Sequence, residues 1–268
     1  MSRFEDEPTP QPYVPPPAQE PAKEVKDLAW SAPFGWLRAG LADFRTCPAL
    51  GLFYGFAFWL MAMVLGLVFQ NKPAYTMTMA SGCLLVGPFF AMGLYEASRR
   101  RELKKAINLA SSLVCWRGHL RSMGLLLGLL MVLELLWGRL AMVVIAVFFD
   151  TGMPSSEDAL QAVLNPENID FVLAYATVGA AFSALVFSIS VVSIPMILDR
   201  DTDAISAAIA SIEVVVSNTG VMLLWGGMIA VLIGLSLWLP WGLGLLIVGP
   251  VLGHASWHAY RGSVRWLT

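Results

Sequence analysis

Two histidines four residues apart are the side chains whose spacing is best suited to chemistry. They are His254 and His258, in the stretch GHASWHAYRG, and on a helix this spacing puts both on one face. Paired imidazoles can bind one metal ion, and Glu96 could complete a set of two histidines and one carboxylate. The same stretch also suits the aqueous end of a membrane helix, where tryptophan, tyrosine and arginine gather. Both interpretations stay open.

A glutamate and an arginine interrupt the apolar run GLLLGLLMVLELLWGRLAMVV. Glu134 and Arg139 each cost about 2.5–3.5 kcal/mol near the centre of a bilayer unless they face protein or water. Their spacing of five is unfavourable for a direct pair on one helix. They predict either a polar contact inside the protein or a functional role, such as proton handling or docking to another membrane protein.

The elements that must position these groups are long apolar runs. The chain has 268 residues, 57% of them hydrophobic and 13% charged, against about 25% charged in soluble domains. A helix needs about 20 apolar residues to cross a bilayer. This predicts an all-α integral membrane protein with six transmembrane helices, at 49–69, 74–97, 123–149, 171–198, 221–239 and 242–260.

Lysine and arginine are concentrated on one side of these predicted helices, and this bias sets orientation. Arg99, Arg200 and Arg261 follow the second, fourth and sixth helices, and Asp199 adjoins Arg200. We expect these four residues to form a cytoplasmic lip. The opposite segment, 150–170, has five acids and no base. Both termini are therefore predicted to be cytoplasmic.

An internal repeat relates the second and sixth predicted helices. LLVGPFFAMGLYEASR (84–99) aligns with LIVGPVLGHASWHAYR (246–261) without gaps, which puts Glu96 on His258. We predict three repeat units, at about 30–100, 101–200 and 201–265, each with an amphipathic interfacial helix before a two-helix hairpin.

The three amphipathic segments share an apolar stripe at helical spacing. In the third segment Asp201 or Thr202 is expected to cap the helix. The stripes are Phe34, Leu37, Leu41 and Phe44; Leu103, Ile107, Ala110 and Val114; and Ile205, Ile209, Ile212 and Val216.

The N-terminal segment 1–28 is rich in proline and acids. Such a composition buries too little apolar surface to fold. We therefore predict a disordered cytoplasmic tail at 1–28 and a membrane domain at 29–268.

Three stretches carry a resemblance to a known family: GPFFAMGLYEASRR (87–100), SIPMILDRD (193–201) and VGPVLGHASWHAYR (248–261). They resemble a bacterial family of polytopic inner-membrane proteins, catalogued as a domain of unknown function (number twenty-one eighty-nine). Some of its members are labelled cytochrome c oxidase subunits. The resemblance, which spans about 30–265, implies a multi-pass protein of the bacterial inner membrane.

Functional motifs give little direction. The sequence has no HExxH, Walker loop, nucleophile elbow or cysteine-ligand motif, so we expect no catalytic residue and no cofactor. The favoured function is a non-catalytic accessory, assembly or scaffold component whose partners are the bilayer and other membrane proteins, such as respiratory complexes, and not nucleic acid. The alternatives are a small-solute or ion transporter and a metal-dependent membrane enzyme.

Overall fold

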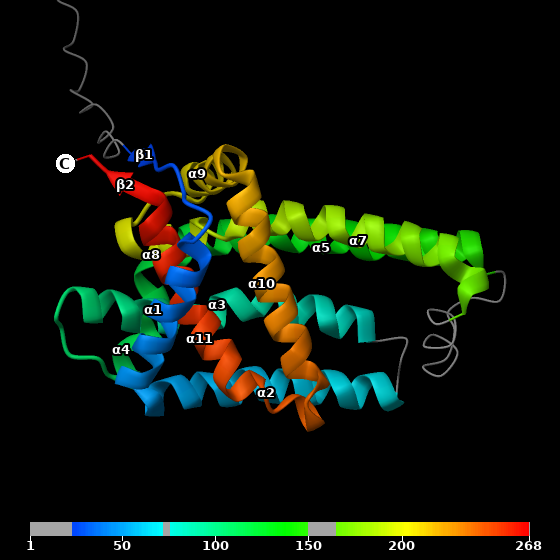
Figure 1. Cartoon of the computed structure of the whole chain (residues 1–268), viewed down its shortest axis with the longest axis horizontal. Coiled ribbons are helices and arrows are strands. Elements are labelled where there is room, and N and C mark those ends of the chain that lie inside the picture. The colour runs from blue at the N-terminus through cyan, green and yellow to red at the C-terminus, as the bar shows by residue number, and fades with distance from the viewer. Residues whose placement is uncertain (1–22, 72–75, 150–164, 268) are drawn as a thin grey trace, which may run out of the picture.

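The computed structural model describes residues 23–71, 76–149 and 165–267. These residues form an all-α fold with one short antiparallel strand pair (Figure 1), which confirms the predicted class. The elements are β1 (Lys23–Val25), α1 (Ala32–Thr46), α2 (Pro48–Asn71), α3 (Thr76–Glu102), α4 (Leu109–Val114), η2 (Cys115–His119), α5 (Leu120–Phe148), η3 (Pro166–Asn168), α7 (Ile169–Ser190), α8 (Ser193–Arg200), α9 (Ala204–Ser217), α10 (Thr219–Trp238), η4 (Pro240–Gly242), α11 (Leu245–Ser263) and β2 (Val264–Trp266).

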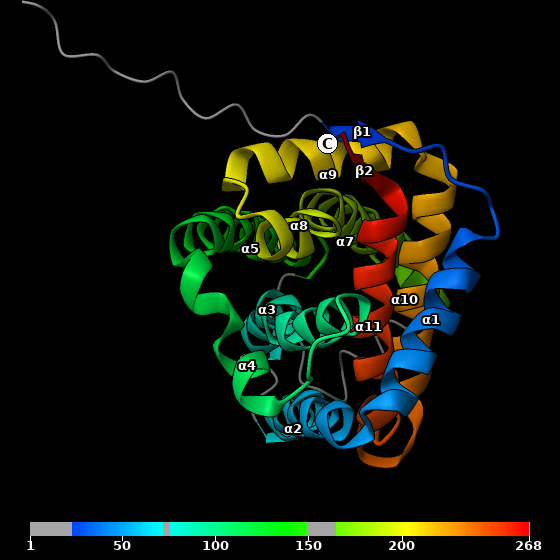
Figure 2. The ribbon, with the colours of Figure 1, turned by 90° about the vertical axis from the view of Figure 1, so that its left-hand side faces the viewer.

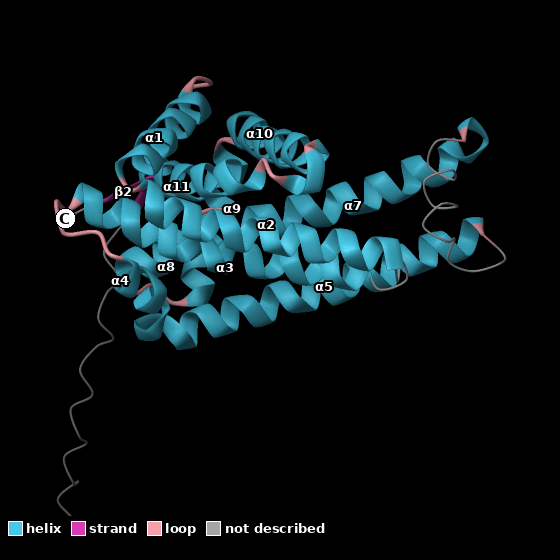
Figure 3. Ribbon diagram, turned by 90° about the horizontal axis from the view of Figure 1, so that it is seen from below, coloured by secondary structure: helices cyan, strands magenta, loops and turns pink. Residues whose placement is uncertain are grey.

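Two helical hairpins, α2–α3 and α5–α7, run side by side along the long axis (Figures 1 and 3). The third pair, α10–α11, runs across them together with α1. Figure 2 shows the four helices of the two hairpins, α2, α3, α5 and α7, nearly end-on. Within the described residues, the third pair of long helices is therefore not aligned with the other two.

Four helical segments are long and apolar enough to cross a membrane by length and composition. They are Pro48–Asn71, Leu109–Phe148, Pro166–Arg200 and Thr219–Trp238. These segments correspond to the predicted first, third, fourth and fifth membrane helices, and two of them end one residue earlier than predicted. The described parts of α3 and α11, which correspond to the second and sixth, are not among the four. Six spans in three hairpins therefore remains a prediction.

The predicted fourth span is broken near its end. Helix α7 stops at Ser190 and α8 starts at Ser193. Pro195 explains the break because its ring nitrogen cannot donate to the carbonyl of Val191. Next to this break, the amide of Val192 donates to the hydroxyl of Ser211 on α9, at 3.1 Å. The break thus joins α8 to α9 at one end of the long helices.

The predicted amphipathic segments form helices of unequal length. The first and third become α1 and α9, whereas the second is reduced to the six residues of α4. Asp203, and not Asp201 or Thr202, caps α9, because its carboxylate accepts from the amides of Ile205 and Ser206. The predicted stripe of α9 is exposed, and the helix buries mainly alanines.

Helix α11 lies in the centre of the fold, in contact with α1, α2 and α3. Glycines allow the close approach: a Cβ atom on Gly40 of α1 would lie 2.6 Å from the Val251 carbonyl oxygen of α11. Gly55 of α2 approaches the Leu246 carbonyl in the same way. Backbone contacts of this kind cannot be relieved by a side-chain rotation, so they fix α11 against its neighbours.

The folded part of the chain includes residues that we assigned to the tail. Strand β1 pairs with β2, with Lys23 opposite Trp266. The Leu28 amide donates to the side-chain oxygen of Asn218 at 2.8 Å. The folded region therefore includes 23–28 and does not begin at 29. Segment 1–22 and the acidic segment 150–164 lie outside the described residues.

Two glycines of α1 provide a matched test of this packing. We expect Gly40→Ala to lower the free energy of unfolding by about 1–3 kcal/mol, because the new methyl group overpacks the contact with α11. Gly35→Ala adds a methyl group to open space and should be neutral or stabilising by up to about 1 kcal/mol. Thermal unfolding in detergent measures both, and equal midpoints for the two variants would contradict the close approach of α1 and α11.

Candidate functional site

Ionisable side chains from α1, α3, α8 and α11 meet at one end of the long helices. We name this set the ion-pair network. Its members are Asp43, Glu96, Glu102 and Asp199, the arginines Arg99, Arg100, Arg101, Arg200 and Arg261, and the histidines His254 and His258.

Asp43 is the most buried carboxylate of the network, with 3% of the residue exposed. Its carboxylate accepts from Ser98 at 2.5 Å and from His258 Nε2 at 2.9 Å, and it pairs with Arg101. Burial alone would raise the pKa of Asp43, but the hydrogen bonds from His258, Ser98 and Arg101 and the charge of His258 outweigh it and hold the pKa at about 2. Asp43 is therefore an ionised anchor that joins α1 to α3 and α11.

His254 is fully buried and continues this chain of hydrogen bonds. Its Nδ1 lies 2.8 Å from the Ser98 hydroxyl. The single hydroxyl proton of Ser98 goes to Asp43, so the Nδ1–H of His254 must donate to Ser98. The Nε2 atom of His254 is buried and has no hydrogen-bond partner within the described structure.

Asp199 is the second centre of the network and links α3, α8 and α11. It accepts from Tyr260 at 2.8 Å and from Arg99 at 3.2 Å. Arg200 and Arg261 lie 3.5 and 3.8 Å from its second oxygen. The structure thus brings together the four residues that we predicted as a lip, and Arg99 and Arg261 occupy matching positions of the proposed repeat.

The other two carboxylates belong to α3. Glu96 pairs with Arg100 at 2.6 Å and with Arg99 at 3.3 Å. Glu102 accepts from the indole of Trp257 at 3.0 Å and pairs with Arg261 at 3.1 Å. Each acid of the network therefore contacts at least one arginine, and together they form a fixed array of charge pairs.

The predicted metal ligands take part in hydrogen bonds and ion pairs. Within the described residues, no group of three histidine, cysteine or acidic side chains is arranged to hold a metal ion. His254 and His258 contact Ser98 and Asp43, while Glu96 contacts arginines. The structure thus gives the histidine pair a role in joining helices.

Glu134 and Arg139 lie on α5, outside the network. Glu134 is half-buried and interacts with another group, whereas Arg139 is exposed. On α7, the hydroxyls of Ser188 and Ser190 donate to the carbonyls of Ala184 and Val186, one turn earlier in the same helix. These two hydroxyls are thereby engaged by their own backbone.

Sequence reasoning missed Asp43, Ser98 and Glu102. A signal for Asp43 existed, because it shares one helical face with Trp36 and Gly40, and this face of α1 is the buried one. The predicted stripe follows a different face of α1, on which Phe34 is exposed and Leu37, Leu41 and Phe44 are half-buried. Ser98 and Glu102 carried no such signal, because a serine and a glutamate next to three arginines are typical of a solvated helix end.

The low pKa of Asp43 predicts how stability depends on pH. An unfolded aspartate has a pKa of about 3.9, and the folded value is about 2. The ionised carboxylate therefore stabilises the fold above about pH 4, and this contribution is lost as pH falls through 2. We expect Asp43→Asn to abolish this part of the acid dependence, measured by unfolding midpoints between pH 6 and 2.

The matched control is Asp27→Asn, because Asp27 is exposed. At neutral pH, Asp43→Asn should lower the free energy of unfolding by about 1–3 kcal/mol, and Asp27→Asn should change it by less than about 0.5 kcal/mol. Identical acid dependence in wild type and Asp43→Asn would show that Asp43 is not the anchor.

Comparisons with known proteins agree with the membrane assignment. Residues 76–199 match the profile of a family described as a predicted integral membrane protein, DUF2189. This segment runs from α3 to α8 and includes Arg139 and the α3 part of the network, but neither Asp43 nor the two histidines. No curated protein and no solved structure matches the chain. Residues 76–199, a little under half of the chain, are therefore similar to the DUF2189 family of predicted integral membrane proteins.

Proposed function

We propose that this protein is a non-catalytic accessory or assembly component that binds another membrane protein through the face of α5 around Arg139. The proposal includes the finer features that the sequence predicts: six spans, a bacterial inner membrane and cytoplasmic termini. Respiratory complexes are the partner class that the family resemblance favours. One observation carries the proposal, namely an exposed arginine on an apolar membrane helix.

Arg139 lies on the side of α5 that faces away from α7. Trp137 of α5 contacts Tyr175 of α7, at 6.3 Å between ring centroids, and Ala141 is buried. Two residues correspond to about 200° of rotation on a helix, so Arg139 points away from both. Within the described residues it makes no ion pair.

The surroundings of Arg139 are apolar. Leu135, Leu136, Leu140, Met142 and Val143 are all exposed. All nine residues from Leu140 to Phe148 are apolar, a length of about 14 Å. A lone arginine in such a segment costs about 2.5–3.5 kcal/mol in lipid. A partner helix with an aspartate or glutamate at the same depth would remove this cost.

The ion-pair network supports a non-catalytic role. Its carboxylates are held by arginines, serine, tyrosine and tryptophan from the same chain. Groups held in this way keep helices in place. The exposed charge of Arg139 differs from them, because nothing in the described chain neutralises it.

The test combines site-specific cross-linking with charge substitution. A photo-cross-linker at Val143, one turn from Arg139, should capture a membrane protein in intact cells, and the same group at exposed Leu223 of α10 is the control. Arg139→Leu should reduce capture by about tenfold or more, corresponding to the loss of a buried charge pair, and Arg139→Lys should retain most of it.

Charge reversal identifies the contact. Arg139→Glu should abolish capture, and an acid-to-arginine change in the captured helix should restore it. Capture that is unchanged in Arg139→Leu would contradict the proposal. Ion or metabolite flux in liposomes that requires Arg139 would favour a transporter instead.

A further inference from the structure

We propose that a basic pocket next to β2 binds a phosphate-bearing anion, and that its natural source is the headgroup of an anionic membrane lipid. The pocket has a volume of about 240 Å³ and is lined by Lys26, Arg200, Arg261, Val264, Arg265 and Trp266. Pockets for drug-sized ligands measure roughly 300–1,000 Å³, so this one suits a headgroup.

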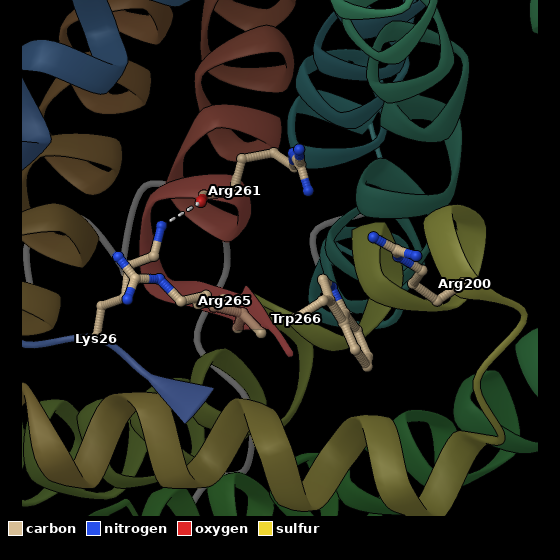
Figure 4. Close-up of a pocket in the computed structure, with 6 residues that line it drawn as sticks. Lys26, Arg200, Arg261, Arg265 and Trp266 are labelled. Carbon is tan, nitrogen blue, oxygen red and sulfur yellow. Dashed lines mark hydrogen bonds between the residues drawn. The ribbon is translucent and has the colours of Figure 1, made fainter. Parts of the chain in front are cut away.

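Three distant parts of the chain build the pocket. Pairing of β1 with β2, together with the hydrogen bond from the Lys26 amide to the Ser263 carbonyl, holds Lys26 at the start of β2, and α8 contributes Arg200. Figure 4 shows Lys26 and Arg265 on one side and Trp266 and Arg200 on the other. Lys26 donates to the carbonyl of Arg261 at 3.3 Å, and Arg200 stacks over the ring of Trp266 at 5.2 Å.

The lining carries four cations and no acid. Each helix C-terminus carries about half a negative charge and attracts cations. Both α8 and α11 end at the pocket. These ends offset about one positive charge. Asp199 is shared among three arginines and a tyrosine. Glu102 pairs with Arg261 at 3.1 Å, where both side chains are about a third or more exposed, and Glu24 lies 3.9 Å from Arg265 in a pair that is largely exposed. Exposed pairs of this kind neutralise little.

Guanidinium groups suit phosphate because they donate parallel hydrogen bonds to two oxygens. Arg265 is 65% exposed at its side chain and Arg200 is 40% exposed, so both can reach a ligand. A tryptophan beside basic residues is typical of the headgroup region of a bilayer.

The adjacent helix α9 favours a lipid over a free anion. The Lys23 ammonium donates to the Ser206 carbonyl of α9, and Asn218 at its other end donates to the Lys26 carbonyl. Segment 23–26 therefore runs along α9. The stripe of Ile205, Ile209 and Val216 on α9 is exposed and suits the boundary between headgroups and acyl chains. A phosphate site and an apolar face thus adjoin.

The experiment measures binding to the full-length protein in detergent. Three probes are titrated: phosphatidylglycerol, phosphatidylcholine and inorganic phosphate. We expect phosphatidylglycerol to bind at least about tenfold more tightly than phosphatidylcholine. The double variant Arg200→Gln/Arg265→Gln should weaken phosphatidylglycerol binding by about 30-fold, and Arg200→Lys/Arg265→Lys should restore part of the affinity.

A double variant of equal charge is the control. Arg38→Gln/Arg117→Gln removes two exposed arginines outside the pocket and should leave binding unchanged. Ligand-free unfolding midpoints show whether each variant is folded, and Arg265→Gln alone replaces the double variant if that one is unstable. Equal phosphatidylglycerol binding by wild type and the pocket variant would overturn the proposal.

The third probe separates the two sources of phosphate. If inorganic phosphate binds with the affinity of phosphatidylglycerol and depends on Arg200 and Arg265, the lipid assignment is wrong. The inference requires a membrane location but no protein partner. Its failure is therefore distinct from a failure of the Arg139 contact, which is measured by cross-linking.

Discussion

The buried carboxylate of Asp43 is the constraint on which this end of the fold depends. An ionised group with 3% of its residue exposed is costly to bury unless partners surround it. Its partners come from α3 and α11, so α1 must lie against both. The glycine contacts between α1 and α11 give the close distance that these short hydrogen bonds require.

In the functions that we propose, buried charges and exposed charges have different roles. The network uses its buried charges to fix helices. Arg139, and Arg200 and Arg265 of the basic pocket at the edge of the network, keep charge at the surface, where in our proposals a partner helix and a phosphate reach it. Both outward sites adjoin exposed apolar residues, of α5 and α9 respectively. This arrangement suits a protein whose contacts lie within and at the surface of a membrane.

Sequence reasoning gave the helical class and the approximate place of each long helix, because long apolar runs leave few alternatives. It also placed Asp199 with Arg99, Arg200 and Arg261, because basic residues gather at helix ends. It did not show that α10–α11 crosses the other hairpins, because the apolar composition of a helix does not determine the direction of its axis relative to other helices. Asp43 was missed because its burial depends on the tertiary contact with α11. For the same reason, the sequence suggested Glu96 and not Asp43 as the acid near His258.

A double-mutant cycle between Asp43 and Arg101 tests the central claim most directly. Unfolding free energies of wild type, Asp43→Asn, Arg101→Gln and the double variant give the coupling between the two side chains. If the network holds α1 against α3, the coupling is favourable by at least about 1 kcal/mol, within the roughly 0.5–3 kcal/mol range of contacting residues. Additive effects, with no coupling, would contradict the account.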